Sequence, residues 1–106
     1  QAVVEAKEGD TMLMLKELTP VRLLKNPFFD QVLEAYQNKA SKEELQELLG
    51  RGRAKKGMFE GDMTDGELEI GQVSASIDEI QSVKTIFENL LSDFEQTKSR
   101  ISHLNL

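Results

Sequence analysis

The 106-residue sequence contains no cysteine and no tryptophan, and it has only one histidine and two prolines. Without cysteine the chain has no disulfide, no thiolate nucleophile and no cysteine-ligated metal or iron–sulfur site. It also lacks an excess of positive charge, because 19 acidic residues outnumber 13 basic ones and give a net charge of −6. A protein that follows a nucleic-acid backbone needs a basic face, so this balance argues against nucleic acid as a partner.

Long apolar runs are missing too, and the run at residues 12–15 is far too short to cross a bilayer. No apolar or arginine-rich leader opens the chain, which begins without methionine, so we expect a segment cut from a longer protein. With 39% hydrophobic and 30% charged residues, the composition is typical of a small folded domain rather than a disordered tail. We therefore predict a folded cytoplasmic protein that makes no membrane contact.

Residues 1–25 predict a helix at the edge of a larger structure, followed by extended segments. Apolar residues lie on one side of a helix over 1–8, and Gly9 ends it. The apolar run at 11–15 has the length of a strand or of a buried extended segment. A second run at 21–24 could pair with the first or wrap a neighbouring surface, and pairing is the less favoured alternative.

Residues 26–50 predict two helices. Asn26 followed by Pro27 is a typical helix start, and Ser41 with Glu44 forms the pattern of a capping box. Gly50 ends the second helix. Apolar residues at helical spacing predict the core, and they are Phe28, Phe29, Val32, Leu33, Tyr36, Leu45, Leu48 and Leu49.

Residues 51–70 predict a glycine-rich charged loop, in which a basic block at 51–56 could pair with an acidic block at 60–69. Residues 71–106 predict two further helices. The first follows from helical spacing of Leu68, Ile70, Val73, Ile77 and Ile80. The second is capped by Ser82 and carries an apolar face of Val83, Ile86, Phe87, Leu90, Leu91, Phe94 and Ile101.

Several motifs suggest chemistry only superficially. The acids of 61–69 do not follow the ligand spacing of an EF-hand, so calcium is disfavoured. Glycine and arginine at 50–53 could hold a phosphate, but the stretch matches no phosphate-binding motif, and a solvated loop is favoured. His103 lies in a polar terminal segment and is not expected to be catalytic. We predict no catalytic residue and no metal site in this chain.

Residues 70–77 are unusual because small side chains line the start of an otherwise apolar helix. Gly71, Ser74, Ala75 and Ser76 remove bulk, which indicates that something comes close there. Tight packing against another element is the favoured explanation. The alternative is that a backbone or a cofactor approaches the helix start.

Three stretches resemble one known family: residues 1–11, residues 20–28, and residues 57–62 continuing through Gly66 to Gly71-Gln72-Val73-Ser74-Ala75. They are similar to the C-terminal part of the nitronate monooxygenases, also called 2-nitropropane dioxygenases, and of the enoyl-ACP reductase II enzymes. The Glu-Gly-Asp to Gly-Gln stretch is the most specific part of the resemblance.

This resemblance implies a mostly α-helical segment, with four or so helices and one or two short strands, from the C-terminal end of an FMN-dependent α/β TIM-barrel oxidoreductase. The parent would oxidise a nitronate or reduce an enoyl thioester with NAD(P)H. The loops that hold the FMN phosphate lie upstream of the matching region, so we expect no FMN binding by this chain alone. The resemblance carries Gly71, Gln72 and Ser74 over as cofactor-binding residues.

The resemblance also implies a partner, which is the upstream barrel of the same parent chain, and a homo-oligomer is a further possibility. Members of this family place a smaller helical part over the barrel mouth, so residues 1–106 would cap the barrel. The alternative from another class is a free-standing acidic helical module. It would dock on a partner through the apolar face of its last helix.

Overall fold

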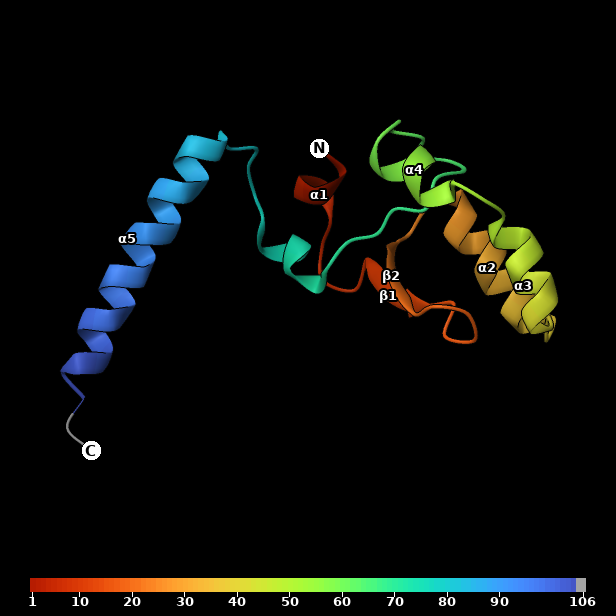
Figure 1. Ribbon diagram of the computed structural model, residues 1–106, viewed down its shortest axis with the longest axis horizontal. Coiled ribbons are helices and arrows are strands. Elements are labelled where there is room, and N and C mark those ends of the chain that lie inside the picture. Colours follow the sequence, from red (N-terminus) through yellow and green to blue (C-terminus); the bar gives the residue numbers. More distant parts are fainter. Residues whose placement is uncertain (105–106) are drawn as a thin grey trace.

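The chain is mostly helical, with two short strands, as predicted. The computed structural model describes residues 1–104, so the last two residues of the predicted C-terminal helix lie outside the described part. It is elongated, with extents of 55 × 35 × 21 Å (Figure 1). Its elements are α1 (Ala2–Glu5), β1 (Thr11–Met14), β2 (Val21–Leu24), α2 (Pro27–Gln37), α3 (Lys42–Leu49), α4 (Arg53–Met58), the 3₁₀ helix η1 (Gln72–Ser76) and α5 (Val83–Ser102).

β1 and β2 form an antiparallel pair, with Thr11 opposite Leu24. The alternative that we considered less favoured is therefore correct, and the preference for a wrapping segment is wrong. The reversal between the strands uses Leu15 at φ 55°, a left-handed conformation that leucine rarely adopts. Because no glycine or asparagine marks this turn, the sequence gives no signal for the pairing.

A third extended segment lies along the other side of β2. The Leu24 amide donates to the carbonyl of Leu68 at 2.9 Å, and the Ile70 amide donates to the carbonyl of Arg22 at 3.0 Å. The helix predicted from the spacing of Leu68 and Ile70 is therefore wrong at its start, because backbone pairing with β2 holds both residues extended. η1 and the single helix α5 follow, rather than two regular helices.

The core lies between the strands and α2. The predicted helix starts are confirmed: the Asn26 side chain accepts from the Phe29 amide at 2.9 Å, and Ser41 and Glu44 form the capping box. The Ser82 cap of α5 is confirmed as well. The core cluster consists of Met14, Leu15, Leu23, Phe28, Phe29 and Val32.

Two predicted boundaries need correction. The first helix ends at Glu5 instead of continuing to residue 8. Within the predicted loop at 51–70, residues Arg53–Met58 form α4. A helix of this length shows too little periodicity to be recognised from sequence.

α4 packs backbone against backbone on the segment that follows it. A Cβ at Gly57 would lie 2.8 Å from the carbonyl carbon of Glu67, and a Cβ at Gly66 would meet the backbone of Gly57. Only glycine permits this approach at either position. The contact fixes where residues 66–70 begin their run along β2.

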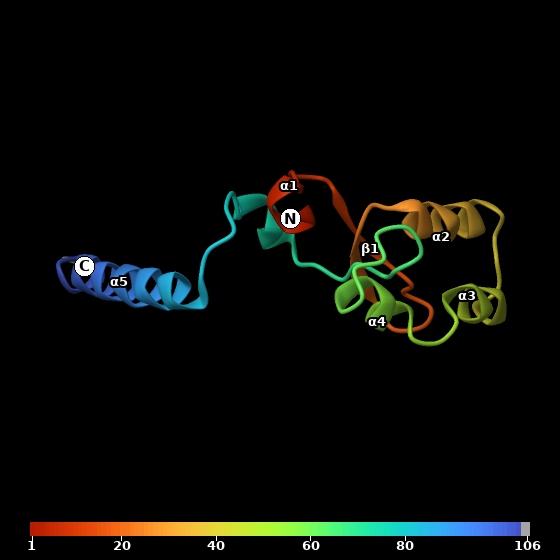
Figure 2. The same cartoon turned by 90° about the horizontal axis from the view of Figure 1, so that it is seen from above.

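α5 stands apart from the rest of the molecule, and none of its residues is buried (Figures 1 and 2). The segment 77–82 connects it to η1. Within residues 1–104, no helix is both long and apolar enough to cross a membrane.

Replacing Gly57 with alanine tests the close contact of α4. Intrinsic helix propensity alone favours alanine by up to about 1 kcal/mol, but the new Cβ would overlap the Glu67 backbone, which cannot move as a side chain can. We expect Gly57→Ala to lower the free energy of unfolding by about 1–3 kcal/mol, measured by urea denaturation.

Gly71→Ala is the matched control. Gly71 has φ −76°, and its Cβ would lie 3.7 Å from the nearest side-chain atom, an ordinary contact. Its effect should stay within about 0.5 kcal/mol. A Gly57→Ala protein as stable as the Gly71→Ala protein would contradict the packing of α4.

Candidate functional site

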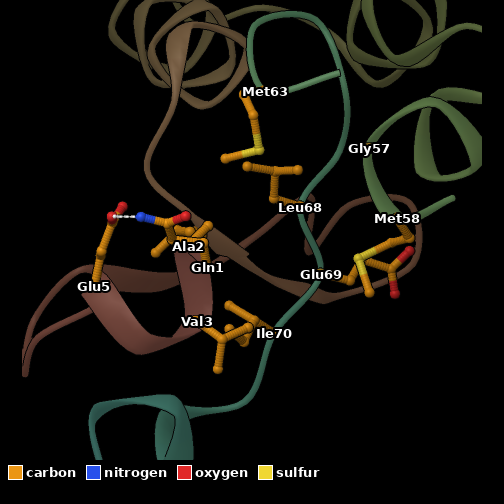
Figure 3. A pocket seen from close by; sticks show the side chains of 11 residues that line it. Gln1, Ala2, Val3, Glu5, Gly57, Met58, Met63, Leu68, Glu69 and Ile70 are labelled. Atoms are coloured by element: carbon orange, nitrogen blue, oxygen red, sulfur yellow. Dashed lines mark hydrogen bonds between the residues drawn. The ribbon is translucent and has the colours of Figure 1, made fainter. Parts of the chain in front are cut away.

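A cleft of about 640 Å³ opens between α1, the end of β2, α4 and the segment 63–70 (Figure 3). α1 forms one side, and Leu68 and Ile70 form another because their pairing with β2 turns this segment past α1. The cleft is lined by Gln1, Ala2, Val3, Glu5, Leu24, Gly57, Met58, Met63, Leu68, Glu69 and Ile70.

The lining is mostly apolar, and its ionisable side chains are the carboxylates Glu5 and Glu69. Glu5 accepts a hydrogen bond of 2.8 Å from the Gln1 amide, which holds it along α1. Neither a basic side chain nor a nucleophile is among these residues. The cleft therefore suits the burial of an apolar surface rather than a reaction of its own.

The predicted residues lie directly beyond this cleft: Gly71 precedes η1, and Gln72 and Ser74 belong to η1, which packs against α1. Gly71 and Gln72 are exposed, whereas Ser74 is 1% exposed. No hydrogen-bond partner for the Ser74 hydroxyl exists within residues 1–104. A buried hydroxyl without a hydrogen-bond partner destabilises the folded protein unless another group bonds to it.

Not every small residue at η1 is explained by a close approach within this chain. In the described part of the chain, no neighbour comes close enough to Gly71 to require a glycine, so the predicted approach by a backbone or a cofactor at Gly71 stays a prediction. Ser74 is packed inside the molecule, in agreement with the favoured explanation of tight packing. Ala75 and Ser76 are exposed.

The residues present do not fit the phosphate of FMN. A phosphate needs cationic or amide donors, but the cleft beside η1 presents carboxylates, and Asp78 and Glu79 follow η1 in the sequence. Gln72 and Ser74 offer an amide and a hydroxyl, which could meet only an uncharged part of a cofactor. We therefore derive no chemical step through FMN in this chain.

The calcium-like stretch is an ordinary turn. Asp62 accepts hydrogen bonds from the amides of Thr64 at 3.0 Å and Asp65 at 2.8 Å. These bonds lower the pKa of Asp62 because they favour its ionised form. In the described part of the chain, no group of three or more possible side-chain ligands could hold a metal ion.

The basic block is mostly not paired with the acidic block. Lys55 forms an exposed ion pair with Glu60 at 3.4 Å, as predicted, but Arg53 does something else. It donates to the carbonyls of Leu48 and Leu49 at the end of α3 and to the carbonyl of Asp65. Its guanidinium also lies 4.4 Å from the ring centre of Phe28. Sequence reasoning missed this role because the contacts join four separate segments.

Glu67 is a second residue that sequence reasoning missed. It is only 6% exposed, although its neighbours in sequence gave no sign of burial. Burial raises its pKa above the ordinary value of 4.5; the carboxylate of Glu69 adds to this, while Arg53 opposes it. His103, by contrast, caps the end of α5 through Nδ1 and the Ser99 carbonyl at 2.6 Å.

Comparison with solved structures finds a similar protein. FabK from Thermotoga maritima is 31% identical, with a TM-score of 0.78, and the match covers 95% of this chain and 32% of that one. A mutant of the same FabK gives 28% identity and a TM-score of 0.71, covering 94% of this chain and 29% of the other. The chain thus has the fold of part of a TIM-barrel protein and spans about a third of its length. Neither family models nor curated protein sequences gave a match.

Glu67→Gln tests the buried carboxyl. Folding raises the pKa of Glu67. At pH values between its pKa in the unfolded chain and its pKa in the folded protein, the folded protein therefore binds more protons than the unfolded chain. The free energy of unfolding therefore falls as the pH rises through this window and stays lower above it. Glutamine cannot ionise, so the variant should lack this loss and become more stable than the native protein as the pH rises from about 4.5.

The measurement is urea denaturation at several pH values, with the exposed Glu34→Gln as control. At each pH, the free energy of unfolding of the native protein is subtracted from that of the variant. This difference removes the contributions of carboxylates that both proteins contain, such as Asp62 and Glu43. Parallel pH profiles for the native protein and Glu67→Gln would show that Glu67 titrates normally.

Proposed function

We propose that this chain is part of an FMN-dependent enoyl-ACP reductase resembling FabK, in which it caps or supports the barrel. The observation that carries the proposal is the structural likeness to FabK over 95% of this chain, at 31% identity. Since it spans about a third of that protein, the activity would belong to the complete parent, and a cytoplasmic location is part of the proposal.

Such a parent would reduce an enoyl thioester with NAD(P)H, and a flavin bound elsewhere in the parent would supply the redox chemistry. The likeness to FabK favours this substrate class over a nitronate. The present chain supplies no catalytic residue in this proposal. The carboxylate-bearing cleft agrees with this role, because the flavin phosphate would be held by the remaining two-thirds of the parent.

The body of the chain offers a surface for that barrel. Several apolar side chains beside the cleft are exposed, among them Met58, Phe59 and Met63. Phe59 is 87% exposed, an unusual position for a phenylalanine in a protein without a partner. We propose that the barrel covers this region, and that Gly71, Gln72 and Ser74 face the flavin side of it.

A free-standing interaction module is the second candidate. It is favoured by α5, whose apolar side chains are all exposed in the described structure. This candidate needs no barrel and no flavin. A transplant into a known FabK separates the two.

We expect a chimera to be active in which this chain replaces the matching third of Thermotoga maritima FabK. It should retain FMN and oxidise NAD(P)H only when an enoyl thioester is present. Isolated, the present chain should show no saturable FMN fluorescence change up to about 1 mM. A folded chimera that loses FMN, or that consumes a nitronate instead, would contradict the proposal.

Ser74→Leu in the same chimera tests the flavin-side assignment. Ser74 is 1% exposed, so leucine should overpack its surroundings and cost about 1–3 kcal/mol, seen as a lower thermal midpoint. The exposed Ser76→Leu is the control and should change stability within about 0.5 kcal/mol.

The two readouts of Ser74→Leu separate the roles of η1. Loss of FMN from the folded Ser74→Leu chimera, together with the lower thermal midpoint and with FMN retained by Ser76→Leu, would place η1 at the cofactor. A loss of stability alone would make it a packing contact and remove Ser74 from the site. No change in either would contradict both roles.

A further inference from the structure

Glu67 is an acidic residue that this chain itself buries. It is only 6% exposed, and both of its backbone contacts are made with α4. Its amide donates to the carbonyl of Arg53 at 3.0 Å, and its carbonyl group lies against Gly57. Because residues 1–104 already enclose Glu67, its burial does not depend on what covers the exposed apolar surfaces.

Within residues 1–104, the Glu67 carboxyl has no hydrogen-bond or ion-pair partner. The charges that act on it are the Glu69 carboxylate of its own segment and the Arg53 guanidinium of α4. Arg53 already donates to the carbonyls at the end of α3 and of Asp65, and it lies over the Phe28 ring. An ionised Glu67 is therefore a charge with little water around it and no direct partner.

The other cations of the adjoining elements face other groups. On α4, Lys55 forms its ion pair with Glu60, and Lys56 acts on the Asp62 carboxylate. On β2, the guanidinium of Arg22 donates to the carbonyl and the hydroxyl of Thr11. In the described part of the chain, none of these three cations forms an ion pair with Glu67.

Glu67 stands at the start of the segment that forms one wall of the cleft. Leu68 and Ile70 line the cleft, and backbone hydrogen bonds to β2 hold both residues in place (Figure 3). η1 follows at Gln72. An outward movement of Glu67 would therefore displace the wall and would loosen the attachment of η1.

We propose that Glu67 is a pH-sensitive switch for this wall. When the carboxyl is uncharged, residues 66–70 stay against α4 and β2, as in the structure. When it is ionised, the segment opens more often, because outward movement lets water reach the charge. The inference concerns the chain itself and does not depend on the proposed enzymatic parent.

The direction of the switch follows from the electrostatics of the closed segment. Burial, with the Glu69 carboxylate adding to it, raises the pKa of Glu67, whereas Arg53 opposes this. The closed arrangement thus disfavours the ionised form. Opening becomes easier as the pH rises from the pKa of Glu67 in the open segment to its higher pKa in the closed segment.

Hydrogen exchange of backbone amides, followed by NMR from about pH 4 to pH 7, tests the switch. The reporters are the amides of Glu67 and Ile70, which lose their acceptors on Arg53 and Arg22 when the segment opens. The amide of Leu33, inside α2, is the reference for global unfolding. Each exchange rate is divided by the rate of an unprotected amide at the same pH, which gives an opening constant.

We expect the opening constants at Glu67 and Ile70 to exceed the constant at Leu33. They should rise by up to about tenfold per pH unit between the two pKa values of Glu67, and level off above them. Glu67→Gln cannot ionise and should lose this rise. Glu69→Gln removes a charge that raises the pKa of Glu67, so the rise should become smaller. The exposed Glu34→Gln is the matched control and should behave as the native protein does.

Equal opening constants at Glu67, Ile70 and Leu33 would mean that these amides exchange through global unfolding alone, and would overturn the switch. A rise with pH that Glu67→Gln retains would overturn it as well, because another group would then cause the rise. If Glu67→Gln does not fold, an undiminished rise in Glu69→Gln is the overturning result. The FMN chimera reports on the proposed parent independently of all these outcomes.

Discussion

The close backbone approach of Gly57 to the segment 66–67 is the contact on which the rest of the body depends. No side chain separates α4 from this segment, since a Cβ on either glycine would meet the other backbone. Polar groups then hold the segment from two sides. Asn26 caps α2 and also donates to the carbonyls of Met63 and Gly66, while Arg53 donates to the carbonyl of Asp65. The start of α2, the end of α3 and α4 are thereby joined through one loop.

The loop in turn determines where the cleft and η1 lie. Once Gly66 is held against α4, Leu68 and Ile70 continue beside β2 and pair with it. Ile70 then faces α1, and η1 follows immediately (Figure 3). The burial of Glu67 is a consequence of the same path, because its backbone lies against Gly57. The contact with Gly57 therefore buries the neighbouring Glu67 carboxyl, and this burial raises its pKa.

The sequence predicted those features whose signals are local. The caps at Asn26, Ser41 and Ser82 depend on bonds within three residues, and all were correctly placed. The extended segment with Leu68 and Ile70 was predicted to be helical because its apolar residues have helical spacing, but backbone hydrogen bonds to β2 keep it extended. Arg53 was assigned to the wrong partners because its acceptors are backbone carbonyls, which no side-chain pattern records. For the candidate site, the small size of Ser74 correctly indicated tight packing, whereas at Gly71 no neighbour within the described chain explains the glycine.

The chain exposes apolar surface in two separate places, which can therefore contact different partners. One lies around the cleft and Phe59, on the compact body; the other lies on α5, beyond the connection at 77–82. The first has no periodic pattern and is shaped by a loop, as expected for a surface that meets a larger body of fixed form. The second is periodic, as expected for an amphipathic helix that packs along its length against another element. Because no residue of α5 is buried, either of the two apolar surfaces can be covered without a change in the other.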